Sequence, residues 1–580
     1  PSNPWGDRAM GTAFDKPTQI FALDLTGNGE FSFAAPTELN RKVKGSEKDE
    51  TGSEQEGEQA GPVVTWDGLT SRLWQVPVSP ANYGHLTMTD STLFVTEQSG
   101  SAAVLKGMAI KHDGKLKAVT SGVAGYALSA DRKSLFVHKQ GKGNKHMYIV
   151  PASTSFPKDL SGKQLDTAGW QMRITPQQEW AQMFHDAWLM HRESLFDPAM
   201  RGLDWKQVEK KYAPLLARVT HRSELNDVFA QMMGELNALH SQVRGGEMPA
   251  DKNAAKAAML GGILEDTADG VLLSHIYRYD SEIPAEAPPL AKPGTDAKEG
   301  DIVLAVNGRE TQTRADVVRA LLNTAGKQVL LTLKRGEEIV KTVVTPTDVN
   351  TDFAQRYRDW VLANSEKVHQ EDADIGYLHL YAMGGNDVAS FAREFYAQYK
   401  KDGLIIDVRR NRGGNVDSMI LEKLLRRVWM FWQYPTGSVG TNMQQTFRGH
   451  LVVLADQFTY SDGETFTAGV KAMRLAPVIG KQTAGAGVWL TGRNRVADNG
   501  MARVAEFPVF AADGRWITEG RGISPDREVD NLPYATFNGK DAQLDAAIRY
   551  LKEQIKLNPV NPLEGETLPD VRTPAHDIRP

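Results

Sequence analysis

The pattern of apolar and polar positions changes twice along the chain. Up to about residue 155, short apolar runs alternate with turns rich in Gly, Asp and Ser, which is typical of short strands. Between 174 and 250, apolar residues recur at helical spacing, which predicts a small helical domain. From 354 onward, continuous apolar runs alternate with helix-like segments. This last pattern predicts an α/β core in which helices cover both faces of a sheet.

The first region repeats a simple unit. Ser129 to Val137, followed by His146 to Val150, has the order turn, strand, loop, strand, which is similar to half of a β-propeller blade. We expect residues 1–155 to form the C-terminal blades of a propeller, with a β-sandwich as the alternative. Because 46–60 holds no apolar side chain larger than alanine, about 41–62 is predicted to be a disordered insertion. The chain does not begin with methionine, so we expect earlier blades and any targeting signal to precede it.

A second small domain is predicted at 253–347. The segment from Gly300 to Gly308 is Gly-Asp-Ile-Val-Leu-Ala-Val-Asn-Gly, and a helix-like stretch at 314–322 and an apolar run at 329–333 follow it. This order resembles a PDZ domain of the kind found in proteases. Such domains add a peptide strand to the edge of their sheet, and a purely structural spacer is the alternative.

The predicted α/β core spans 354–556. Its buried strands are expected at 404–408 and 451–454, and a last helix is expected at 541–551. The Pro-rich residues 557–580 predict an extended tail. The expected fold class is therefore a multidomain α+β protein with a partial β-propeller, a small helical bundle, a PDZ-like domain and a layered, crotonase-like α/β core.

Composition narrows the classes of function. A chain of 580 residues is too long for one hydrophobic core, and a formal net charge of −5 argues against a nucleic-acid surface. The absence of cysteine excludes disulfides, thiolate zinc sites and a cysteine nucleophile. No apolar stretch approaches the roughly 20 residues that a membrane span needs.

The common cofactor motifs are also missing. The sequence has no Walker A loop, no dinucleotide-binding GxGxxG after a strand, no HExxH and no GxSxG elbow. Phosphoryl transfer, hydride transfer and zinc hydrolysis therefore lack their usual signals. No metal or organic cofactor is implied.

One serine stands at a strand-to-helix turn. Ser461 follows the apolar run 451–454 at the point where a helix is expected to begin. Free backbone N–H groups and the positive end of the helix dipole would stabilise an oxyanion there. An ordinary helix N-cap is the alternative role of this serine.

A second turn carries paired glycines. Gly413 and Gly414 follow the buried run 404–408, and glycine lets a backbone N–H group approach a substrate without a side chain in the way. Together with the N–H group of Asp462, these glycines are the candidate oxyanion donors. The alternative is that they only turn the chain. The arginines of the same turn, Arg409, Arg410 and Arg412, bind a peptide carboxylate or form a solvated basic turn.

These two turns resemble the tail-specific and tricorn protease clan. The segment Asp407-Val-Arg-Arg-Asn-Arg-Gly-Gly414, followed by Tyr460-Ser-Asp-Gly463, carries the resemblance, which covers about 174–555 well and the first 155 residues loosely. It implies that Ser461 is a nucleophile, that His240 is its general base and that Glu519 is the third catalytic residue. His240 would take the proton of Ser461 and return one to the leaving amine, and Glu519 would orient the imidazole directly or through a hydroxyl.

One position departs from the tricorn pattern. Tricorn-type enzymes usually carry a serine immediately before the histidine, and this chain has Leu239. Because leucine cannot relay a hydrogen bond, Ser241, a water molecule or a direct contact of Glu519 would have to replace the missing serine. Loss of the correct histidine tautomer costs on the order of 10⁴ in turnover.

The predicted function is that of a tricorn-like serine endopeptidase acting on unfolded polypeptides or oligopeptides. The alternatives are a peptide-binding scaffold with an impaired active site and a hydrolase of non-peptide esters or amides. The resemblance implies a closed homo-oligomer of undetermined size. It also implies a cytoplasmic location, with the periplasm as the alternative.

Overall fold

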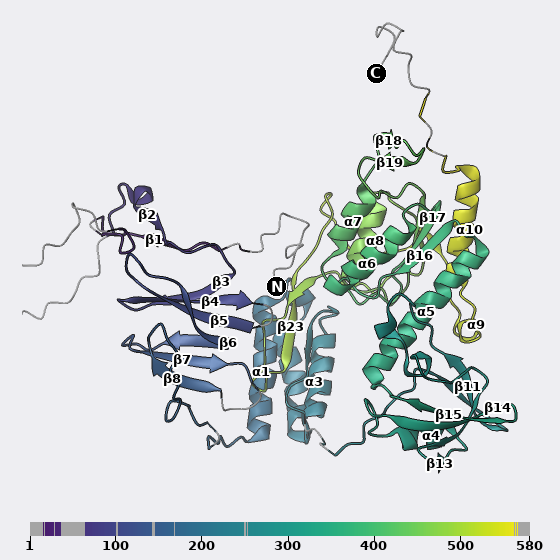
Figure 1. The fold of residues 1–580 in the computed structure, drawn as a ribbon, viewed down its shortest axis with the longest axis horizontal. Coiled ribbons are helices and arrows are strands. Elements are labelled where there is room, and N and C mark those ends of the chain that lie inside the picture. The colour runs from purple at the N-terminus through teal and green to yellow at the C-terminus, as the bar shows by residue number, and fades with distance from the viewer. Residues whose placement is uncertain are drawn as a thin grey trace, which may run out of the picture. The chain divides into compact units, whose positions relative to one another are not determined.

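The computed structural model describes residues 16, 18–27, 29–35, 64–99, 102–141, 146–167, 169–248, 251, 253–561, 563 and 565–566. The chain divides into two compact units, Pro1–Ile174 and Thr175–Pro580 (Figure 1). The insertion predicted at about 41–62 lies outside the described residues, and so does most of the tail predicted at 557–580.

The N-terminal unit consists of antiparallel strands, as the alternating pattern predicted. A two-stranded sheet joins β1 to β2, and a six-stranded sheet follows in chain order from β3 to β8. Phe94, Leu105 and Leu135, which belong to three strands of this larger sheet, are fully buried in one apolar cluster. The propeller itself stays a prediction. The elements are β1 (Phe21–Leu23), η1 (Leu69–Arg72), β2 (Leu73–Gln75), β3 (Tyr83–Met88), β4 (Thr92–Ser99), β5 (Ala102–Ala109), β6 (Lys117–Leu128), β7 (Ser134–Lys139) and β8 (Met147–Pro151).

The helical domain begins the second unit. Its elements are α1 (Pro176–Ser194), η2 (Met200–Gly202), α2 (Trp205–Tyr212), η3 (Ala213–Arg218), α3 (Arg222–Gly234) and β9 (Gln242–Arg244). Two strands from much later in the chain, β22 (Trp489–Thr491) and β23 (Met501–Phe507), complete it in a three-stranded sheet of order β22-β23-β9. Val488 and Val504 share the buried core of α1 and α3. The helical domain and the core are therefore joined by packing as well as by sequence.

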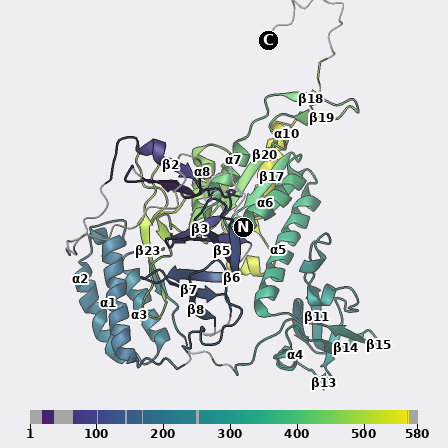
Figure 2. The same ribbon diagram turned by 60° about the vertical axis from the view of Figure 1, so that its left-hand side comes forward.

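The PDZ-like domain has the predicted order of elements. They are β10 (Gly262–Thr267), β11 (Gly270–Ile276), η4 (Pro284–Glu286), η5 (Pro289–Ala291), β12 (Ile302–Val306), β13 (Arg309–Glu310), α4 (Arg314–Leu321), β14 (Val329–Arg335) and β15 (Glu338–Val344). The sheet order β10-β11-β12-β14-β15 leaves β10 at an edge, and α4 contacts it. Figure 2 shows these strands apart from the bundle formed by α1 to α3.

The α/β core is built on a five-stranded parallel sheet of order β16-β17-β20-β21-β24. Its strands are β16 (Ile375–His379), β17 (Gly403–Asp407), β20 (His450–Ala455), β21 (Val478–Gly480) and β24 (Arg527–Glu528). The helices are α5 (Val349–Glu371), α6 (Gly385–Gln398), α7 (Asp417–Leu425), α8 (Asp462–Ala472), α9 (Pro533–Phe537) and α10 (Ala542–Leu557), and β18 (Phe431–Gln433) pairs with β19 (Val439–Thr441).

The sheet is buried on both faces, as its continuous apolar runs predicted. Ile405, Val452 and Leu454 are at most 1% exposed and pack in one cluster with α5 and α10. The last helix runs to Leu557, past the predicted end at 551, because Ile555 still packs against this cluster.

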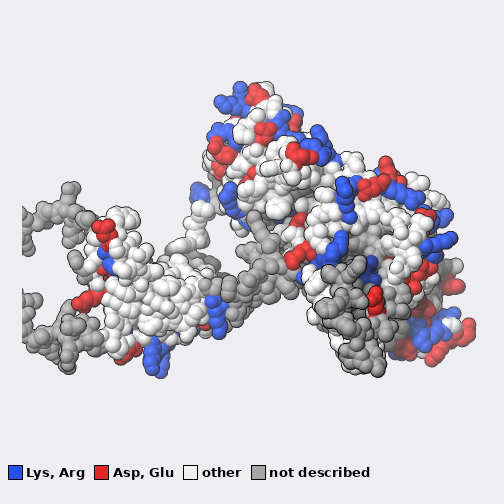
Figure 3. Space-filling view, turned by 90° about the horizontal axis from the view of Figure 1, so that it is seen from above, with Lys and Arg blue, Asp and Glu red and all other residues white. Residues whose placement is uncertain are grey.

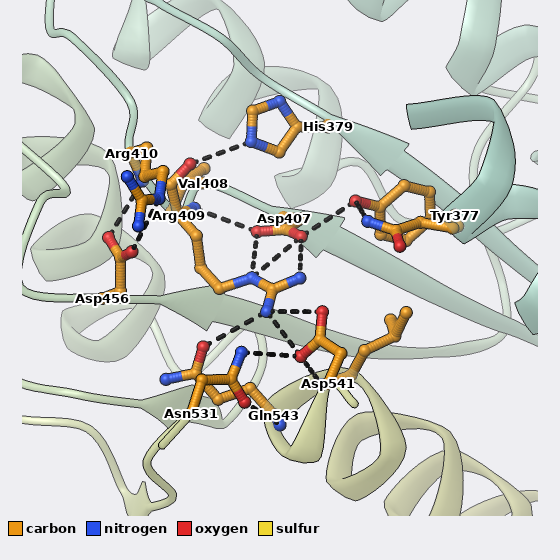
Figure 4. A network of polar contacts seen from close by, with 12 residues as sticks. Tyr377, His379, Asp407, Val408, Arg409, Arg410, Asp456, Asn531, Asp541 and Gln543 are labelled. Carbon is orange, nitrogen blue, oxygen red and sulfur yellow. Dashed lines mark hydrogen bonds and ion pairs between the residues drawn. The ribbon is translucent and has the colours of Figure 1, made fainter. Parts of the chain in front are cut away.

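Arg409 forms ion pairs that link the start of α10 to the end of β17 (Figure 4). Its guanidinium donates to both carboxylate oxygens of Asp407 and to both of Asp541, at 2.7 to 3.0 Å, and its side chain is only 6% exposed. Arg410 instead has a 73% exposed side chain over the ring of Phe458. Of the arginines in this turn, Arg409 is therefore an internal part of the fold.

Candidate active site

Ser461 lies at the N-cap of α8 in an unusual backbone conformation. Its φ of 56° and ψ of −119° lie outside the regions that residues with a side chain normally adopt. The Ser461 hydroxyl makes no capping hydrogen bond, while its N–H group donates to the Glu464 carboxylate at 3.0 Å. Strained residues of this kind concentrate at functional sites, where the surrounding structure holds them in place.

The first of the paired glycines lies directly against this serine. A Cβ atom added to Gly413, whose φ is +78°, would lie 2.5 Å from Ser461 Cβ and 3.0 Å from Ser461 Oγ. A Cβ atom added to Gly414 would collide with the carbonyl of Met383 at 1.8 Å. Only glycine therefore fits at either position, and the two predicted turns form one site.

The oxyanion donors can be separated by their hydrogen bonds. The N–H group of Gly413 already donates to Asn411 Oδ1 at 2.9 Å. The N–H groups of Gly414 and Asp462 donate no backbone hydrogen bond within the described part of the chain. These two N–H groups therefore remain candidate oxyanion donors.

The Asp462 side chain ties the glycine loop to the start of α8. Its Oδ2 atom accepts hydrogen bonds from the N–H groups of Val416 (2.7 Å) and Asp417 (3.1 Å), and the residue is 1% exposed. Burial, with the nearby carboxyl group of Asp417, raises the pKa of Asp462 to about 7. Its Oδ1 atom is buried and has no hydrogen-bond partner among the described residues.

His240 is held in the tautomer that a general base needs. Its Nδ1 atom lies 2.5 Å from the carbonyl oxygen of Val488, to which it donates, so its Nε2 atom carries the lone pair. The ring is 4% exposed and packs edge-on against Tyr460, the residue before the nucleophile, with centroids 5.1 Å apart. Burial lowers the pKa of His240, and Arg503 adds to this, so the neutral form that accepts a proton is favoured at neutral pH.

Tyr460 connects the two catalytic candidates. Its hydroxyl donates to the carbonyl oxygen of Leu239 at 3.1 Å. Burial and the carboxylates of Glu464 and Glu519 raise the pKa of Tyr460 to about 12, so this hydroxyl keeps its proton. Through Tyr460 the turn that holds His240 is fixed beside the turn that holds Ser461.

Glu519 reaches the histidine through a peptide group. Its Oε2 atom accepts from the N–H groups of Gly487 (2.8 Å) and Val488 (2.9 Å), and the carbonyl of the same Val488 holds His240. Within the described part of the chain, Glu519 makes no hydrogen bond to His240 and none to a hydroxyl. Its other oxygen, Oε1, is buried without a hydrogen bond and lies 4.0 Å from Arg201 Nη1.

Neither residue beside the histidine replaces the missing serine. Ser241 Oγ accepts from the N–H group of Ala505 at 3.3 Å and is thus directed at β23. The side chain of Leu239 is 45% exposed. The group that lies between Glu519 and His240 is therefore the Val488 peptide, not a hydroxyl.

Glu464 is a site residue that the sequence analysis missed. It is fully buried and accepts four hydrogen bonds, from Ser461 N–H and from Thr483 Oγ1 (2.6 Å), Gly485 N–H (2.6 Å) and Ala486 N–H (2.7 Å). Burial raises the pKa of Glu464, and these hydrogen bonds oppose the rise. The pattern Ser-x-x-Glu at the start of a helix was the available signal.

Metal-binding clusters and membrane-spanning helices were also sought among the described residues. Among them, no group of three or more His, Asp or Glu side chains is placed to hold a metal ion. No helix within the same residues is long and apolar enough to cross a membrane. On the face of the second unit seen in Figure 3, Lys and Arg are interspersed with Asp and Glu.

Comparisons with known proteins agree with this architecture. Residues 374–529 match the model of peptidase family S41, 176–234 match the tricorn protease C1 domain, and 260–348 match the tricorn protease PDZ domain. Tricorn protease homolog 1 of Streptomyces coelicolor is 31% identical over 438 residues, which are 73% of this chain and 40% of that protein. Tricorn protease of Thermoplasma acidophilum is 28% identical over 456 residues, which are 78% of this chain and 42% of that protein.

A solved structure supports the same fold. The crystal structure of the tricorn protease superposes with a TM-score of 0.79 and 24% identity, over 93% of this chain and 51% of that one. The chain thus spans about half the length of these relatives, or less. The fold and the matched domains show that the chain is a multidomain protein with a core of peptidase family S41. The predicted resemblance to the tricorn-type proteases is confirmed, since the chain carries their helical, PDZ and peptidase domains in the same order.

Proposed function

We propose that the chain is the catalytic part of a tricorn-like serine endopeptidase that cleaves unfolded polypeptides or oligopeptides. The observation that carries this proposal is the approach of Gly413 to Ser461, together with a buried His240 whose Nδ1 atom is tied to a carbonyl. A serine, a neutral imidazole and unpaired N–H groups are the parts that acyl transfer requires.

The proposed reaction uses these groups as follows. Ser461 Oγ attacks the peptide carbonyl while His240 Nε2 takes its proton. The oxyanion that forms accepts hydrogen bonds from the N–H groups of Gly414 and Asp462. His240 then gives the proton to the leaving amine, and a water molecule, activated by the same imidazole, hydrolyses the acyl-enzyme on Ser461.

Glu519 supports the charged histidine without touching it. The imidazolium formed in the reaction lies beyond the Val488 peptide, whose N–H group faces the Glu519 carboxylate and whose carbonyl faces His240. This peptide is polarised in the direction that stabilises positive charge on the ring. In the proposed mechanism this peptide takes the relay role that Leu239 cannot supply.

The PDZ-like domain suits the same role. Its strand β10 is at an edge of the sheet beside α4, which is the geometry in which PDZ domains add a peptide strand. We expect it to anchor the polypeptide whose bonds are cleaved. A homo-oligomer, as implied by the resemblance, is part of the same proposal.

A fluorophosphonate probe tests the proposal directly. Wild type is expected to be labelled and to digest unfolded casein, whereas Ser461→Ala and His240→Ala lose turnover by roughly 10³-fold or more. Circular dichroism of each variant controls for folding. A folded wild type that neither labels nor digests would instead favour the peptide-binding scaffold, and one that cleaves small esters but no peptide would favour the non-peptide hydrolase.

A further inference from the structure

A cavity of about 520 Å³ opens between helix α3 and strand β9, close to the catalytic histidine. Its floor is apolar, since Met233, Ala238 and Val243 line it and are 3 to 5% exposed. Ala230 and Leu239 line it at exposed positions. A volume of this size is typical of sites that hold a small ligand or several side chains.

Strand β9 gives this cavity a backbone edge. In the sheet of order β22-β23-β9, strand β9 pairs with β23 on one side, and no strand within the described residues pairs with its other side. Gln242, Val243 and Arg244, the whole of β9, line the cavity. A free strand edge beside a helix is the arrangement that binds an extended peptide by adding a strand.

The cavity adjoins the turn that carries His240. Leu239 and Ser241, the residues on either side of His240, both line it. The carbonyl of Leu239 also receives the Tyr460 hydroxyl, and Tyr460 precedes Ser461. An extended chain in the cavity would therefore lie beside the turn that holds His240.

The role of His240 as general acid indicates which part of a substrate would occupy the cavity. A general acid must lie beside the leaving amine, which belongs to the residue that follows the cleaved bond. We infer that the α3–β9 cavity binds the segment of the substrate that follows the cleaved bond, as an added strand with an apolar side chain against Leu239, Met233 and Val243. At about 3.3 Å per residue, the three-residue strand β9 spans roughly three substrate residues.

In this arrangement the side chain of Leu239 would contact the substrate. The position that carries a relay serine in the resembling family is here an exposed apolar wall of the cavity. The relay passes to the Val488 peptide, so residue 239 is free to contact substrate. The inference rests on the proposed peptidase function, and the experiment below separates the failure of one from the failure of the other.

The first experiment compares two neighbouring exposed positions of α3. Ala230 lines the cavity and Gln231 does not, so Ala230→Arg fills the cavity with a charged side chain and Gln231→Arg is its matched control. Each protein digests a proteome-derived peptide mixture, and the sequences of the new N-termini are determined. Fluorophosphonate labelling of Ser461 is measured in parallel.

Wild type and Gln231→Arg are expected to favour apolar over acidic residues about tenfold within the first three positions after the cut. Ala230→Arg should lose this preference and should lose peptide kcat/KM much more than labelling rate. A labelled wild type without the preference, or equal loss in both variants, overturns the inference. An unlabelled wild type refutes the proposed peptidase instead.

A second measurement does not depend on turnover or on the folding of Ala230→Arg. The Ser461→Ala chain is mixed with an apolar peptide carrying a photoreactive phenylalanine, and the cross-linked residues are mapped. Cross-links to Met233, Leu239 or β9 support the cavity as the binding site. Cross-links confined to the PDZ-like domain overturn the inference.

Discussion

Two largely buried carboxylates, Glu464 and Glu519, accept hydrogen bonds from neighbouring residues of the same loop, but they do so differently. Glu464 is fully buried and uses both oxygens to accept four hydrogen bonds from Ser461 and residues 483–486. The side chain of Glu519 is 11% exposed and uses one oxygen for residues 487 and 488, while its second oxygen has no hydrogen bond and faces Arg201.

This difference in hydrogen bonding indicates different roles for the two carboxylates. A carboxylate whose lone pairs are all engaged fixes the backbone around it, which is the task of a structural part. A carboxylate with an unengaged oxygen keeps negative charge available to a neighbouring group. We therefore expect Glu464 to be needed for assembly of the site and Glu519 for the charge that develops on His240.

Glu464→Gln is expected to give the largest effect. The amide nitrogen of glutamine would replace one carboxylate oxygen and would face the two donors that this oxygen now accepts from. Because these donors would be left unpaired in a fully buried site, the unfolding free energy should fall by roughly 3 kcal/mol or more. Denaturant unfolding followed by circular dichroism measures this. Peptidase activity should fall with it, and an unchanged stability would show that Glu464 is not the part that fixes the loop.

Glu519→Gln is the same chemical change with a different expected result. Glutamine still offers one oxygen to the N–H groups of Gly487 and Val488, so the unfolding free energy should fall by only about 1 kcal/mol or less. Turnover should fall by about 10 to 100-fold, because the imidazolium loses a nearby negative charge. If the two variants lose equal stability, the division of tasks between the two carboxylates is wrong.

The sequence predicted the parts of this site that depend on local pattern. The turns that carry Ser461 and Gly413–Gly414 stand at the ends of apolar runs, and the structure brings them into contact. The contact between Val488 and His240 could not be predicted in this way, because it depends on the pairing of β23 with β9, which are far apart in the sequence. The burial of Arg409 was likewise hidden, since its partner Asp541 belongs to a distant helix.

Asp462→Asn tests a third buried carboxylate, which resembles Glu519 in having one unpaired oxygen. Because its pKa is raised from 3.8 to about 7, the folded chain binds a proton that the unfolded chain has lost, and stability falls as pH rises between these values. Asparagine keeps an acceptor for Val416 and Asp417 and carries no charge. The variant should therefore gain Tm relative to wild type at pH 8, and the gain should shrink at pH 5.

One control variant accompanies thermal unfolding at both pH values. Asp513→Asn, at an exposed turn, should show no such pH-dependent difference. A gain in Tm that is the same at pH 5 and pH 8 would mean that Asp462 does not titrate in this range.

Leu239→Ser is expected to give the smallest effect on turnover, and it tests whether the peptide group of Val488 is a sufficient relay. Val488 already engages both Glu519 and His240, so the added hydroxyl has no vacant place between them, and kcat on a small ester should change by less than about threefold. The measurement is steady-state kinetics on a p-nitrophenyl ester, with Leu239→Ala as the matched variant that lacks a hydroxyl. A rise of tenfold or more in the serine variant alone would mean that Glu519 stabilises the charged His240 better through a hydroxyl than through the Val488 peptide.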